Sequence, residues 1–80
     1  MDPHFKDGFL IYLDDGFEIS VPIRHLVKVG YSINKKFTRI NFTDSSFMTF
    51  PDPDKEFYNK AKKEMYTELH PELNFIKKLN

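Results

Sequence analysis

The hydrophobic pattern of this 80-residue chain changes its period once, at Pro51. Before Pro51 apolar side chains recur at every second position, as at Phe17, Ile19 and Val21, which are expected to face a core. A period of two places alternate side chains on one face of an extended strand. After Pro51 the apolar residues recur at every fourth position: Phe57, Ala61, Met65 and Leu69. That spacing marks one face of an α-helix, so the pattern predicts an α+β fold with strands first and a helix last.

The first part of the chain is predicted to form a meander of about five antiparallel strands. These strands cover residues 9–13, 17–21, 26–33, 37–42 and 47–50. Asp14, Asp15 and Gly16 are expected to form the turn between the first two strands, in which Gly16 is free to adopt a positive φ. Residues 1–8 are interpreted as a polar segment that leads into the first strand.

The second part is predicted to form an amphipathic helix over residues 53–69 and a short terminal helix over residues 72–79. Asp52 suits the N-cap position, and Pro53 suits the first helical position. We expect the meander to pack on the longer helix, so that the whole 80-residue chain is one small domain.

Composition excludes several classes of protein. The chain has no cysteine, which excludes disulfides, zinc sites with thiolate ligands and cysteine nucleophiles. A small domain without disulfides is typical of a reducing compartment, and a cytoplasmic location is therefore expected. The longest apolar run is Phe9–Leu13, far shorter than a membrane span, and the first residues do not have the pattern of a signal peptide. We expect no membrane partner.

The sequence contains no recognisable catalytic or metal-binding motif. His4, His25 and His70 have no His, Asp or Glu at a familiar ligand spacing on the same element. The glycines are isolated, and no serine has the sequence context of a nucleophile elbow. We therefore predict that the protein is not an enzyme and has no cofactor or metal, and an enzyme centred on His25 is the remaining catalytic alternative.

Charge is distributed unevenly although the net charge is zero. Residues 24–39, which we call the basic hairpin, contain five basic residues and no acidic residue. Phe37 is expected to share a strand face with Arg39. Basic side chains beside an aromatic ring on a β-ribbon are typical of surfaces that bind acidic proteins or the phosphate backbone of nucleic acids.

The chain is also rich in aromatic residues, with nine Phe and four Tyr. A core of this size does not bury all of them. Strand and helix parity predicts partial exposure for four: Tyr12, Phe37, Tyr66 and Phe75. Exposed aromatic side chains are enriched in protein interfaces.

These observations predict a small, non-enzymatic binding module that docks on a larger intracellular protein and regulates or inhibits it. The abundance of Phe, Ile, Asn, Lys and Tyr indicates an AT-rich genome, which suits a bacterial or phage accessory protein such as an inhibitor of a host defence system. The candidate partner-binding residues are Arg24, Lys28, Lys35, Lys36, Phe37 and Arg39. The alternatives are a nucleic-acid-binding β module that uses the same hairpin, and self-association as a homodimer.

Overall fold

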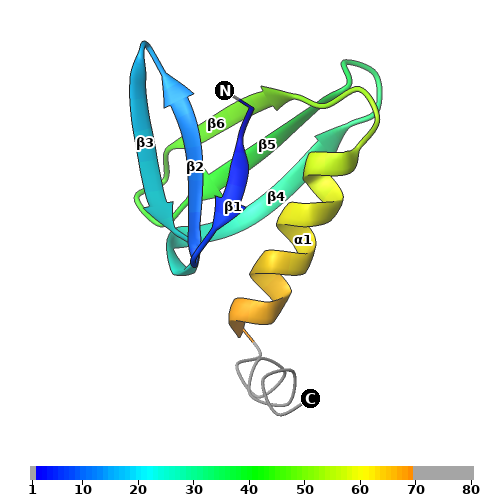
Figure 1. Cartoon of the computed structure of the whole chain (residues 1–80). Coiled ribbons are helices and arrows are strands. Elements are labelled where there is room, and N and C mark those ends of the chain that lie inside the picture. The colour runs from blue at the N-terminus through cyan, green and yellow to red at the C-terminus, as the bar shows by residue number, and fades with distance from the viewer. Residues whose placement is uncertain (1, 70–80) are drawn as a thin grey trace.

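The computed structural model describes residues 2–69, except for the side chain of Leu69 (Figure 1). Within that range, six antiparallel strands form two three-stranded sheets that pack against one C-terminal helix. The α+β fold with its antiparallel strands and final helix is thus confirmed. The predicted terminal helix over residues 72–79 lies outside the described residues, as do His70 and Phe75.

The first sheet has the order β1-β2-β3, and the second has the order β4-β5-β6. The strands of the first sheet are β1 (His4–Lys6), β2 (Phe9–Asp14) and β3 (Phe17–Pro22). A 3₁₀ turn, η1 (Ile23–His25), then leads into the second sheet. Its strands are β4 (Leu26–Ser32), β5 (Phe37–Phe42) and β6 (Phe47–Pro51), and α1 (Glu56–Leu69) follows.

Strand β1 is a correction to the predicted five-strand meander, which treated residues 1–8 as a lead-in. Asp7 and Gly8 have φ angles of 54° and 84°, and Asp15 and Gly16 have φ angles of 52° and 81°. Both pairs form two-residue loops between antiparallel strands. Positive φ at both central residues is the requirement of a type I′ turn, which Asp-Gly satisfies readily. The same dipeptide therefore makes both hairpins, and the first one adds the sixth strand.

The start of the helix is a second correction, because α1 begins at Glu56 and not at residue 53. Lys55 has a φ of 68°, which lies in the left-handed region and interrupts a right-handed helix. The residues before it form a turn in which the Lys55 amide donates to the Asp52 carbonyl at 3.2 Å. The first helical hydrogen bond runs from the Asn59 amide to the Lys55 carbonyl at 3.1 Å.

The core joins both sheets to the helix. Its buried apolar side chains are Leu10, Tyr12, Leu26, Ile40, Phe50, Phe57 and Ala61. The Phe50 ring makes edge-on contacts with Tyr12 of the first sheet and Phe57 of the helix, with both centroid separations at 5.2 Å. Such contacts add stabilisation of about 0.5–1.5 kcal/mol per pair beyond the area that the rings bury.

Two expectations about individual side chains were wrong. Tyr12 is only 6% exposed, because its ring lies between the sheets against Phe50. Phe17 is 68% exposed. It is the first residue of β3, where it pairs with Asp14 beside the hairpin turn, and it is not part of the core cluster. Ile19 and Val21, in the same alternating pattern, pack against the core as expected.

Helix α1 packs against β4, η1 and β1, at the side of the molecule away from β3 (Figure 1). Its Phe57 ring stacks on Phe5 of β1 at a centroid separation of 5.6 Å, and Tyr58 lies 5.7 Å from Tyr31 of β4. The helix therefore contacts the inner face of the second sheet, and no element within residues 2–69 covers the outer face of that sheet.

Candidate binding surface

Alternation along β5 separates the two faces of the second sheet. Thr38 and Ile40 are fully buried, whereas Arg39 between them is exposed. The register pairs Arg39 with Gly30 of β4 and Thr49 of β6, so these residues share its face. We call this side the outer face and the side of Ile40 the inner face.

The outer face combines cations with aromatic rings. Its residues are Lys28, Gly30 and Ser32 of β4, Phe37, Arg39 and Asn41 of β5, and Phe47, Thr49 and Pro51 of β6. None of them is acidic. Phe47 is 56% exposed, and the Arg39 guanidinium lies over its ring at 5.7 Å from the centroid. An exposed aromatic ring with a cation over its face gives one surface two kinds of contact with a partner.

The structure brings together most of the candidate residues that the sequence indicated. Lys28, Phe37 and Arg39 lie on the outer face. Lys35 and Lys36 are exposed in the turn between β4 and β5, at one end of the same hairpin.

Arg24 is the exception, because it belongs to η1 and borders a different groove, together with Met65 and Glu68 of α1. Phe47 was not among the candidates. The period of two along β6 places Phe47 opposite to Phe50, and this alternation was the sequence signal that could have identified it.

The turn that carries Lys35 and Lys36 is held by hydrogen bonds. The Lys36 amide donates to the Ser32 carbonyl at 2.8 Å, and the Lys35 amide donates to Ser32 Oγ at 3.2 Å. The Lys36 carbonyl accepts from the Asp52 amide at 3.0 Å. The basic turn is therefore tied to the segment that begins the helix.

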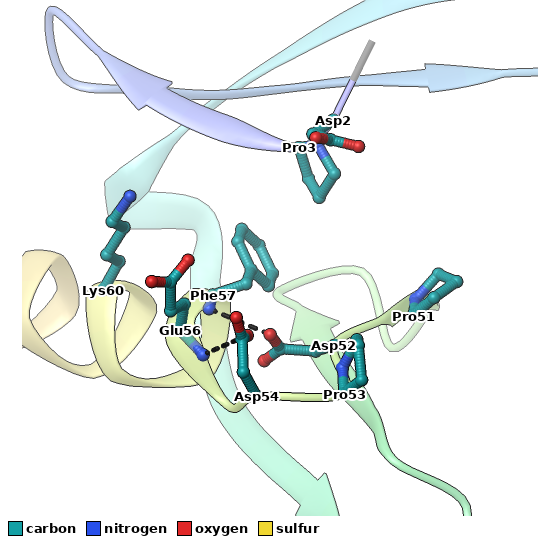
Figure 2. A pocket seen from close by; sticks show the side chains of 9 residues that line it. All are labelled: Asp2, Pro3, Pro51, Asp52, Pro53, Asp54, Glu56, Phe57 and Lys60. Carbon is teal, nitrogen blue, oxygen red and sulfur yellow. Dashed lines mark hydrogen bonds between the residues drawn. The ribbon is translucent and has the colours of Figure 1, made fainter.

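Asp52 connects the inner face of the second sheet to α1. It is 3% exposed, and its Oδ2 accepts from Thr38 Oγ1 at 2.7 Å and from the Tyr58 amide at 2.8 Å. Its Oδ1 accepts from the Phe57 amide at 3.1 Å (Figure 2). Since buried polar groups are costly unless paired, a carboxylate with three donors is a structural anchor. Asp52 is therefore not at the predicted N-cap position, and Pro53 is not the first helical residue, because α1 begins at Glu56. The Asp52 side chain nevertheless caps the helix, through the amides five and six residues ahead.

A hollow beside this anchor lies between the N-terminal residues Asp2 and Pro3 and the start of α1 (Figure 2). Its carboxylates include Asp52, whose two oxygens are already engaged, and Asp54, whose Oδ1 accepts from the Glu56 amide at 3.1 Å. These interactions start the helix, and they explain the presence of Asp52 and Asp54 in this hollow without a ligand.

Neither a metal centre nor a membrane span is found in residues 2–69. No group of three or more His, Cys, Asp or Glu side chains in this range is placed to hold a metal ion. No described helix combines the length and the apolar character needed to cross a bilayer.

Comparison with protein families, with curated proteins and with solved structures finds no match to this chain.

Proposed function

We propose that this protein is a small binding module that docks on a larger intracellular protein through the outer face of its second sheet. Docking would regulate or inhibit that partner, as accessory proteins of bacteria and phages do. The observation that carries the proposal is Phe47, which is exposed on a face that holds Lys28 and Arg39 and no acidic residue.

Folding does not account for the position of the Phe47 ring. It is outside the core cluster, whereas Phe50, three residues along the same strand, belongs to it. Burying an exposed aromatic side chain against a partner is worth about 1.5–3 kcal/mol when the burial is complete. Aromatic and arginine side chains at the centre of an interface carry much of the binding free energy.

The cations define the chemistry of the partner. Lys28 and Arg39 lie on adjacent strands of the face, and Lys36 lies in the turn at its end. A positive face accelerates association with a negative one and excludes partners of like charge. The expected partner is therefore a protein with an apolar cavity or cleft, which receives Phe47, surrounded by Asp or Glu side chains.

The test is capture from an extract of the source cells with the tagged protein, followed by nuclease treatment and a moderate salt wash. We expect one stoichiometric protein to survive both treatments. Phe47→Ala is expected to lower its retention at least about tenfold, which corresponds to about 1.4 kcal/mol. Phe17→Ala is the matched control, because Phe17 is an exposed phenylalanine of the first sheet, and it should leave retention unchanged.

A second pair of variants tests the charge. Arg39→Glu should abolish retention of the partner. Lys63→Glu, which makes the same change in charge at an exposed position of α1, should preserve retention. Equal retention by the Phe47 and Phe17 variants would contradict the docking surface. Recovery of nucleic acid that leaves with salt, and of no protein, would replace the proposal with the nucleic-acid alternative for the basic hairpin.

A further inference from the structure

A second candidate site is a groove lined by residues of the first sheet, of β5 and β6 and of the turn between them. That turn lies on the side of the molecule away from α1 (Figure 1). It encloses about 500 Å³. Three aromatic residues line it: Tyr12 of β2, Phe42 of β5 and Phe47 of β6. The Tyr12 and Phe42 rings are nearly parallel, with centroids 6.5 Å apart and an angle of 17° between their planes.

Two carboxylates, from hairpins of different sheets, line this groove. Asp14 ends β2, and Asp44 lies in the β5–β6 turn. Among the residues that line the groove, His25 is the only one with a basic side chain, and there is no Lys or Arg. The groove is therefore an aromatic surface with two acidic groups, the opposite charge character from the outer face.

Hydrogen bonds fix the Asp44 carboxylate in place and in its charged form. Both the amide and the hydroxyl group of Ser46 donate to Asp44 Oδ1. These bonds lower the pKa of Asp44 from its ordinary value. Burial raises the pKa of Tyr12, and the negative charges of Asp14 and Asp44 raise it further, which is consistent with both carboxylates lying near the phenol.

Tyr12 is only 6% exposed, so the ring surface that the groove offers to a ligand comes from Phe42 and Phe47. The chemistry that fits these rings beside two carboxylates is that of a guanidinium ion. Its plane stacks on aromatic rings, and its five N–H groups donate to carboxylates in a fixed fork geometry. An ammonium ion offers a point charge and no plane to stack. We propose that this groove binds the side chain of an arginine presented by a polypeptide partner. The groove shares Phe47 with the outer face but uses different charged residues, Asp14 and Asp44, so the charge variants of the two proposals are tested separately.

The test is a titration of the ¹⁵N-labelled protein, followed by NMR, with N-acetyl-arginine-N-methylamide. The citrulline analogue is the matched control, because it keeps the shape of the side chain and removes its charge. The arginine compound should produce saturable shifts confined to residues around the groove, with a Kd in the range of about 1–10 mM, as expected for one side chain. The citrulline compound should bind at least about tenfold more weakly, and the capped lysine should fall between them.

Variants of the β2–β3 hairpin decide whether the groove is the binding site. Asp14→Asn should weaken arginine binding about fivefold, since it removes one charged acceptor. Asp15→Asn removes the same charge from the neighbouring turn position, which does not line the groove, and should change affinity by less than about twofold. Among the hydrogen bonds seen in the structure, none that orders the hairpin is accepted by the side chain of either aspartate. An unchanged ¹⁵N spectrum away from the turn will verify that each variant is folded.

Three results would overturn the arginine proposal: no saturable shift, equal binding of the citrulline compound, or equal effects of the two variants. None of these results would contradict docking through the outer face if the capture experiment succeeds. Conversely, a failed capture with a positive titration would remove the docking proposal and retain the groove.

Discussion

Each face of the second sheet has a phenylalanine from β6, but the two rings lie in different surroundings. Phe50 on the inner face is 5% exposed and contacts Tyr12 and Phe57, whereas Phe47 on the outer face is 56% exposed and contacts Arg39. Both lie on β6, three residues apart. Alternation along one short strand therefore directs one phenylalanine into the core and presents the other to solvent.

The difference in burial between the two faces shows which aromatic residues stabilise the fold. The inner face gains stability because α1 and the first sheet remove its side chains from water. The outer face has no such cover within the described residues, and its apolar area contributes little to the folded state. Variants at the two faces should therefore separate stability from binding.

The largest effect is expected at Asp52, the anchor between the inner face and α1. Asp52→Ala removes the acceptor of three donors, two of which are amides of the first helical turn. The free energy of unfolding, measured by urea denaturation, should fall by about 3 kcal/mol because buried donors are left unpaired. Asp54→Ala, which loses one exposed bond to the Glu56 amide, should cost about 0.5–1 kcal/mol. Equal losses would contradict the role of Asp52 as an anchor.

A smaller effect is expected at Asp44, an exposed aspartate that also accepts a main-chain amide bond. Its pKa in the folded protein lies below the ordinary value of 3.8, so its contribution to stability is present above that value and is lost as the pH falls below it. Ser46→Ala removes the hydroxyl donor and should raise the pKa of Asp44 toward 3.8, while the amide bond keeps part of the shift. The carboxyl ¹³C shift of Asp44, followed against pH, measures this change. Ser45→Ala is the control, and a pKa unaffected by Ser46→Ala would show that the hydroxyl bond does not stabilise the carboxylate.

Much of the fold follows from local patterns in the sequence. A continuous apolar run identified β2, and period-two alternation identified β3 to β5. The turn before Phe47 identified β6, and the change at Pro51 identified the helix. Strand β1 was not predicted, because three residues are too few to display a period. Its turn was nevertheless indicated, since Asp7-Gly8 repeats the dipeptide of Asp15-Gly16. Lys55 shows a different limit, since nothing in a lysine indicates a positive φ.

The binding surface could be predicted only in part. Charge and parity placed Lys28, Phe37 and Arg39 on one face, because these residues share one hairpin. The exposure of Phe17 could not be inferred from parity, which indicates a face of the strand but not whether anything covers it. The groove between Asp14 and Asp44 depends on how two sheets pack, a relationship between segments far apart in the sequence.

Urea denaturation of Phe50→Leu beside Phe47→Leu measures what each face of the second sheet contributes to stability. Phe50→Leu should lower the free energy of unfolding by about 2 kcal/mol, because it removes two aromatic contacts and leaves a void. Phe47→Leu should change it by less than about 0.5 kcal/mol, as exposed substitutions do. A loss at Phe47 as large as that at Phe50 would show that the outer face serves the fold, and would contradict its assignment as a binding surface.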